Sequence, residues 1–156
     1  MTTTSGANIS VKPAFDLNSL NQVKASDQGY EFEFISESYG ATGIYFSVLG
    51  EQSNVVKEWV RKKVNQKRTQ DLMRQKKGKE AIVEFEQDER ESRESAAIRL
   101  TGWRGLYKDL SVASPEPLEF NFENALNLVS INDEIFQAII KNSGEVSNFT
   151  KAKPTV

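Results

Sequence analysis

The feature that most constrains the fold is an alternation of aromatic and acidic residues, Tyr-Glu-Phe-Glu-Phe, which begins at Tyr30. Successive side chains of a β-strand point to opposite faces, so the pattern predicts a half-buried strand with Tyr30, Phe32 and Phe34 facing inward and the acids facing water. A second apolar run, residues 44–49, follows a turn with two glycines. Because two strands alone are marginal in water, we expect an antiparallel pair covered by helices.

Two long charged segments follow and predict a pair of antiparallel helices. Ser53 is a suitable N-cap for a helix over about 54–77, and Gly78 interrupts the pattern. A second helix is expected over about 79–101, with Gly102 ending it. The apolar residues of the first helix recur at helical spacing: Val56, Trp59, Val60 and Val64.

The last third of the chain predicts a proline-containing loop followed by two short helices. The loop covers 107–119. Asn121 can cap a helix to about residue 130, and Asn132 or Asp133 begins a last helix. The apolar stripe of that helix consists of Ile135, Phe136, Ile139 and Ile140.

These elements together predict an α+β fold: a small antiparallel sheet of two or more strands, packed by the helix pair and a C-terminal helical segment. We expect a flexible N-terminal arm over 1–13, one domain over 14–150 and a flexible tail over 151–156. The segment 14–27 has a short apolar pattern and is expected to form a single turn or a docking arm.

Two residue types are missing from the sequence, and this narrows the chemistry. Among 156 residues there is no His and no Cys. This excludes disulfides, thiolate metal sites, His-ligated zinc and the His-dependent nucleophile arrangements. The sequence contains neither the phosphate-binding loop Gly-x-x-x-x-Gly-Lys-Ser/Thr nor a Gly-x-Gly-x-x-Gly motif after a strand. We therefore expect a binding or assembly protein without cofactor or metal, and not an enzyme.

Charge is distributed unevenly along the helix pair. Residues 57–80 carry ten basic and three acidic residues, a net charge of +7, whereas 84–99 carry a net charge of −3. The basic stretch allows a nucleic-acid contact. A solvated helix face opposite an acidic helix is the favoured interpretation, because no ladder of aromatic residues accompanies the charges. The residues of the less favoured interpretation are Lys62, Lys63, Lys67, Arg68, Arg74, Lys76 and Lys77.

The sequence suggests no targeting or membrane segment. Its start lacks the basic and apolar regions of a secretory signal, and the longest apolar runs are only a few residues. A membrane-spanning helix needs about 20 apolar residues, so we expect a soluble cytoplasmic protein with no membrane partner.

Trp103 lies between Gly102 and Gly105, at the expected end of the second helix. Two roles suit an aromatic residue there: an anchor that locks the helix to the strands, or a hot spot for a partner. The anchor role is the favoured one.

The order of these parts resembles small tail assembly chaperones of long-tailed bacteriophages. The resemblance lies in two N-terminal strands, the basic helix VVKEWVRKKVNQKR, the apolar-Thr-Gly-Trp step from Ile98 to Trp103, the stretch Pro117 to Ala125, and the pair Asn148–Phe149. It covers about residues 30–150. The chain departs from the family at Phe122, where many relatives have proline, and in the length of its N-terminal arm.

The resemblance implies a non-catalytic protein that binds the tape measure protein in the host cytoplasm and helps recruit tail tube subunits. Such chaperones are commonly absent from the finished virion. Self-association is left open, and nucleic-acid binding is not expected. The candidate partner-binding residues are Val56, Trp59, Val60, Trp103, Phe136, Ile139 and Ile140. The alternatives are a structural virion protein and, less favoured, a nucleic-acid-binding regulator that uses the basic helix.

Overall fold

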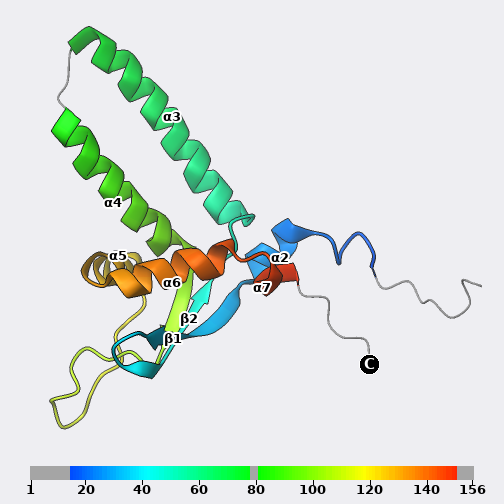
Figure 1. Ribbon diagram of the computed structural model, residues 1–156, viewed down its shortest axis with the longest axis vertical. Helices are drawn as coiled ribbons and strands as arrows, with labels where there is room; N and C mark the ends of the chain where they lie inside the picture. Colours follow the sequence, from blue (N-terminus) through cyan, green and yellow to red (C-terminus); the bar gives the residue numbers. More distant parts are fainter. Residues whose placement is uncertain (1–14, 78–80, 151–156) are drawn as a thin grey trace, which may run out of the picture.

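The computed structural model describes residues 15–77 and 81–150, with the side chains of 15–73 and 87–150 (Figure 1). The expectations for the arm 1–13, the tail 151–156 and the break at Gly78 lie outside these residues. The elements in chain order are α2 (Gln22–Gln28), β1 (Tyr30–Ser36), β2 (Gly40–Val48), α3 (Asn54–Lys77), α4 (Ala81–Arg99), β3 (Leu100–Arg104), α5 (Phe122–Ile131), α6 (Asp133–Gly144) and α7 (Ser147–Thr150). The chain has the α+β fold that the sequence predicts.

The sheet has three antiparallel strands in the order β1-β2-β3. Phe32 of β1 pairs with Phe46 of β2, and Phe46 pairs in turn with Trp103 of β3. As predicted, Phe32 and Phe34 are buried, and Tyr30 is half-buried. The first two strands are joined by a turn in which Gly40 has a φ of +73°, a conformation that favours glycine.

The predicted extent of the second helix is wrong at its C-terminal end. Helix α4 ends at Arg99, and the chain runs directly into β3. The backbone N–H of Leu49 donates to the carbonyl of Arg99 (2.7 Å), and Val48 pairs with Leu100. Gly102 is therefore a strand residue and not the helix breaker. Pairing with the exposed edge of β2 overrides the local helical pattern, since it satisfies backbone groups that an unpaired strand would leave open.

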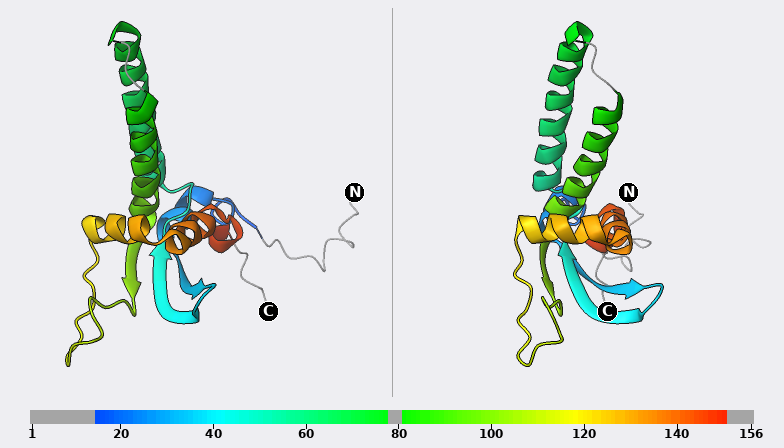
Figure 2. Two further views of the ribbon diagram at one scale, coloured as in Figure 1. Left: turned by 60° about the vertical axis from the view of Figure 1, so that its left-hand side comes forward. Right: turned by 90° about the vertical axis from the view of Figure 1, so that its left-hand side faces the viewer.

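The core lies between one face of the sheet and the helices that cover it. It combines Phe46 and Val48 of the sheet with two small residues, Ala96 and Ala97, at the end of α4. Helices α5 and α6 complete it with Val129, Ile139 and their neighbours. Figure 2 shows α5 and α6 lying across the base of the long helices, with the sheet on the other side.

The helix starts agree with the predicted caps. The Ser53 hydroxyl accepts from the backbone N–H of Val56 (3.2 Å) at the start of α3. The side chains of Asn121 and Asn132 accept from the backbone of Asn124 and Ile135 at the starts of α5 and α6. Each cap satisfies an amide that the helix cannot pair internally.

The segment expected to be a single turn or docking arm contains a helix. Asn21 caps α2 by accepting from the N–H of Lys24 (3.0 Å). This helix packs beside α7 (Figure 1), and the ring of Phe149 in α7 makes an edge contact with Tyr30 at the start of β1. Helices α2 and α7, one from each half of the chain, therefore lie together on one side of the body.

Helices α3 and α4 form a two-helix stalk that projects from the body on the side away from the sheet (Figures 1 and 2). Of the α3 side chains that the structure describes, only Val56 is buried. Val60, Val64, Leu72 and Met73 are all more than 40% exposed. Among the side chains that the structure describes, α3 beyond Val56 therefore contributes no buried apolar residue to the stalk.

Candidate functional site

The two stalk helices contact each other through polar side chains. Lys63 of α3 lies 3.7 Å from the carboxylate of Glu94 in α4, and Gln87 donates to Gln70 (3.3 Å). Lys63 also lies over the Trp59 ring, 5.7 Å from its centroid. Such pairs stabilise a helix pair weakly, each by less than about 1 kcal/mol. Among the described side chains, the two helices are therefore joined by polar contacts, and Val60 and Val64 of α3 remain exposed.

An open groove lies where α3, α4 and α6 meet, and we call it the central groove. Its volume is about 500 Å³. Trp59 of α3 and Phe136 and Ile140 of α6 form its apolar walls. The α4 side is polar and consists of Asp88, Glu91, Ser92, Ser95 and Arg99. The groove therefore combines apolar surface with two carboxylates.

A second open groove, the side groove, lies next to the N-terminal turns of α3. It has a similar volume, about 500 Å³, and its charge is opposite. Val56 and Val60 supply its apolar surface, and Lys57 and Arg61 supply cations. Glu51, Gln52 and Arg99 complete the lining. One side of α3 thus borders an acidic groove and another side borders a basic one.

Arg99 lines both grooves, although only 7% of the residue is exposed. Its guanidinium donates to the Ser143 hydroxyl (3.0 Å) and to the carbonyl and hydroxyl of Ser95. Glu51 is the nearest carboxylate, at 3.8 Å. Burial lowers the pKa of Arg99, and the Glu51 charge acts in the opposite direction. This network joins α4 to α6 and holds the Arg99 side chain in place between the two grooves.

The sequence interpretation did not identify Arg99. A sequence feature that marks Arg99 does exist: it is the one charged residue in the otherwise apolar run from Ala96 to Leu100. A charged residue in such a run is enclosed when that face packs on a core, and it must then be hydrogen-bonded. What the sequence could not supply was Ser143, which is 44 residues away along the chain.

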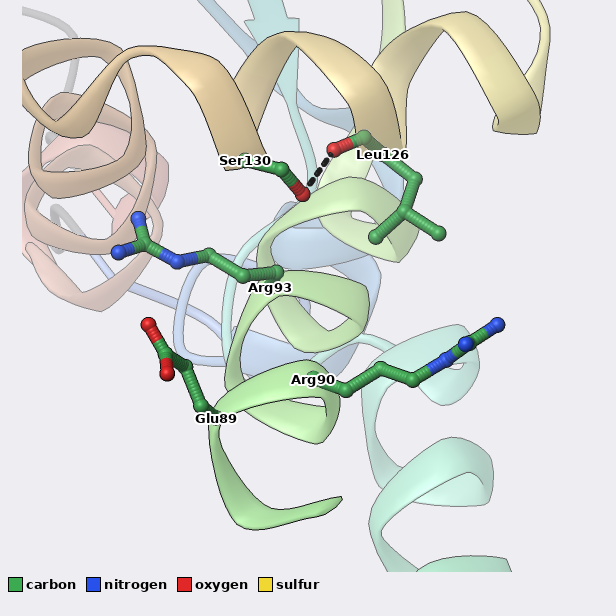
Figure 3. A pocket seen from close by; sticks show the side chains of 5 residues that line it. All are labelled: Glu89, Arg90, Arg93, Leu126 and Ser130. Carbon is green, nitrogen blue, oxygen red and sulfur yellow. Dashed lines mark hydrogen bonds between the residues drawn. The ribbon is translucent and has the colours of Figure 1, made fainter. Parts of the chain in front are cut away.

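A third hollow lies between α4 and α5, with a volume of about 450 Å³ (Figure 3). Glu89, Arg90 and Arg93 of α4 line one side, and Leu126 and Ser130 of α5 line the other. The side chain of Arg90 points away from Glu89 and Arg93, and Ser130 donates to the carbonyl of Leu126 (2.6 Å). The mixture of charges gives this hollow no preferred ligand.

The structure brings together three of the seven candidate partner-binding residues, Trp59, Phe136 and Ile140, in the central groove. Val60 borders the side groove and is 44% exposed. Ile139 packs in the core with 0% exposure, and Val56, at the edge of the side groove, is only 2% exposed, so neither offers a partner much surface.

Trp103, the remaining candidate, lies far from these grooves, in the sheet. Its indole N–H donates to the carbonyl of Leu118 (2.8 Å), and its ring makes edge contacts with Phe46 and Phe120. These contacts anchor the loop after β3 to the sheet.

The basic candidates on α3 divide into two groups. Lys62, Lys67 and Arg68 are exposed and make no ion pair with the described part of the chain, whereas Lys63 is partly covered and pairs with Glu94. The side chains of Arg74, Lys76 and Lys77 lie outside the described residues. The cations therefore do not line a common concave surface in the described region.

Residues 15–77 and 81–150 contain no cluster of three or more acidic residues placed to hold a metal ion. No helix in these ranges is long and apolar enough to cross a membrane.

Comparison with protein-family models, curated proteins and solved structures finds no match to this chain.

Proposed function

We propose that this chain is a non-catalytic phage tail assembly chaperone that binds helices of the tape measure protein and assists assembly of the tail tube around it. The proposal starts from the order of sequence parts that resembles such chaperones. The observation that carries it furthest is the central groove, where Trp59, Phe136 and Ile140 face an opening of about 500 Å³ at the base of the stalk. A groove of this kind suits one face of an amphipathic helix.

The stalk supports the same proposal. Val60 and Val64 are exposed on one side of α3, one turn apart, and would be covered by a long partner helix. Exposed apolar side chains that lie together on one side of a helix, rather than singly, form a surface that a partner can cover. The function places the protein in the host cytoplasm during assembly and outside the finished virion.

The test is co-expression with the tape measure protein encoded nearby, followed by affinity capture and sizing. We expect a soluble complex, with the tape measure protein insoluble when it is expressed alone. The groove variant Ile140→Asp should abolish capture, and circular dichroism establishes that it is folded, since Ile140 also packs against the core. The matched control is Ile131→Asp, because Ile131 is 73% exposed and lies outside both grooves.

Two outcomes would redirect the proposal. Failure of the wild-type chain to form a complex, with the chain present in purified particles by mass spectrometry, would indicate a structural virion protein. Capture that Ile140→Asp leaves unchanged would place the contact elsewhere on the surface.

One observation favours a second candidate function, a nucleic-acid-binding regulator. Lys62, Lys67 and Arg68 are exposed and unneutralised within the described part of the chain. If they bind phosphates, filter binding should detect a complex with duplex DNA or RNA at about 50 mM salt that weakens steeply as salt rises. Absence of binding at that salt concentration would dismiss this candidate.

A further inference from the structure

We propose that a second copy of this chain occupies the central groove with the side of α3 that faces away from α4. We call that side the outer face of α3 and define it by Lys57, Val60, Arg61, Val64 and Arg68. Two copies would then exchange the same contact, with each copy inserting its outer face into the groove of the other. The second copy would use the same groove and the same two valines as the tape measure helix of the proposed function, so the two occupants would compete, and each is tested by its own measurement.

The outer face is a single stripe of the helix. Its residues are spaced by three, one, three and four positions, which places them along one side of an α-helix. The residues that contact α4, Lys63 and Gln70, lie on a different side. Among the side chains that the structure describes, the outer face therefore makes no ion pair or hydrogen bond with α4.

The outer face is both apolar and cationic. Val60 and Val64 are 44% and 43% exposed, and the basic side chains flank them. Of these, Arg61 forms a local ion pair with Glu58 (2.8 Å), and both side chains are largely exposed. An exposed pair of this kind is weak, so it exchanges readily for a better partner.

The central groove has the complementary chemistry. Trp59, Phe136 and Ile140 would cover the two valines of the incoming helix. Asp88 and Glu91, on the α4 side, would face its Lys57 and Arg61. Arg99 also lines this side, but its guanidinium is held by Ser95 and Ser143, so the groove keeps a net negative charge. Opposite charges around an apolar centre fix the register of a contact and disfavour other partners.

The arrangement also satisfies a symmetry requirement. In a two-fold dimer each contact occurs twice, so a surface must carry both complementary parts. This chain has both at the base of the same stalk, a basic apolar helix face and an acidic apolar groove. The two stalks would then associate side by side, with the two sheets on the outside.

The test is sedimentation velocity of the full chain over a concentration series, at about 50 mM and about 500 mM salt. We expect a species of twice the 17.6 kDa chain mass that weakens at the higher salt. Two charge reversals probe the contact: K57E/R61E on the outer face and D88K/E91K in the groove. Each should weaken dimerisation at least tenfold, because like charges would then face each other twice.

The decisive sample combines the two reversals. An equimolar mixture of K57E/R61E and D88K/E91K should form a heterodimer, since every contact again joins opposite charges. The matched control is K24E/K141E, which reverses two exposed lysines outside the grooves and should dimerise like the wild type. Circular dichroism establishes that each variant is folded.

Three results would overturn the proposal: a wild-type monomer up to about 1 mM, the weak end of specific association; a dimer that both reversals leave intact; or a mixture that fails to associate although each variant is folded. The second result would identify a different interface. The first would leave the groove to another occupant, such as a tape measure helix, whose binding is measured separately by capture.

Discussion

The guanidinium of Arg93 stacks on the ring of Phe136, with its Cζ atom 4.1 Å from the ring centroid. The same side chain donates to the carbonyl of Val129 (3.0 Å) and to the carboxylate of Asp133 (3.2 Å). One residue of α4 thus holds both α5 and α6, and it separates the hollow of Figure 3 from the central groove. Its contacts position Phe136 at the groove wall.

Arg93→Ala should therefore lower the free energy of unfolding by about 2 kcal/mol, since hydrogen bonds to charged groups contribute about 1.5–3 kcal/mol. Arg93→Lys should recover only part of this, because an ammonium cannot reproduce the planar stack on Phe136. Urea denaturation measures both. The control is Arg90→Ala, which removes an exposed side chain that points away and should stay within about 0.5 kcal/mol of wild type. Equal losses at the two positions would contradict the role given to Arg93.

Gly50 lies where α2 passes close to the end of the sheet. Its backbone N–H donates to the Ser26 carbonyl (3.1 Å), and an added Cβ would lie 2.7 Å from the Cβ of Ser26. Gly50→Ala should then destabilise the fold by about 1–3 kcal/mol, the usual range for overpacking. Gly102→Ala is the matched control, since nothing lies within 4 Å of its added Cβ. Thermal unfolding of the two variants measures the difference in stability. A Gly50→Ala protein as stable as Gly102→Ala would contradict the close contact between Gly50 and Ser26.

Glu31 and Arg104 join the two outer strands of the sheet across β2. The guanidinium of Arg104 donates two hydrogen bonds to the Glu31 carboxylate (3.0 and 3.1 Å) and lies over the Tyr45 ring. The hydrogen bond from Arg104 lowers the pKa of Glu31 below its usual value of 4.5. A carboxyl with a lowered folded-state pKa stabilises the fold above its unfolded pKa and loses that contribution as pH falls through the folded value. We expect a modest loss of stability below about pH 4.5 for the wild type.

Arg104→Gln should return the pKa of Glu31 toward 4.5 and remove this part of the acid sensitivity. Titration of the side-chain carboxyl groups by NMR measures the shift. Asp109 supplies an internal control, because hydrogen bonds from Ser111 lower its pKa independently of Arg104. A Glu31 pKa that does not change in the variant would show that another group holds it down.

Residues 64–73 of α3 should exchange their amide hydrogens much faster than residues 135–139 of α6. The side chains of the first segment are exposed, apart from half-buried Gln70, whereas Ile135 and Ile139 are 4% and 0% exposed. Local opening costs little free energy where few apolar contacts are lost. Hydrogen exchange with mass spectrometry tests this, and equal protection in the two segments would contradict a loosely held stalk. Under the proposed function, protection of residues 64–73 should rise when a partner helix binds.

The sequence was most informative where one local signal decides the structure. The aromatic alternation fixes the inward residues of β1, and the capping residues locate the starts of α3, α5 and α6. Each of these depends on side chains within a few residues. The helix α2 carried no comparable apolar stripe, and its only buried residue is Ser26. Packing against distant segments therefore supports a helix that the local pattern did not predict.

The third strand shows where local reasoning fails. The run Ile98–Leu100 suits a helix or a strand, and the free edge of β2 selects the strand from Leu100 onward. The candidate site divides in the same way. Trp59, Phe136 and Ile140 were identified as apolar positions, but their convergence on one groove depends on how α6 crosses the base of the stalk. The pairing of Arg99 with Ser143 likewise depends on the tertiary fold.

The packing of α2 beside α7 provides a reference point on the body against which the position of the projecting stalk can be measured. Residues 22 and 150 belong to neighbouring helices on the body, while α3 extends in another direction (Figure 1). A fluorophore placed in either of these helices and a second one at exposed Leu72 would form a molecular ruler. Energy transfer between the two fluorophores would report any movement of the stalk relative to the body, with or without a partner bound.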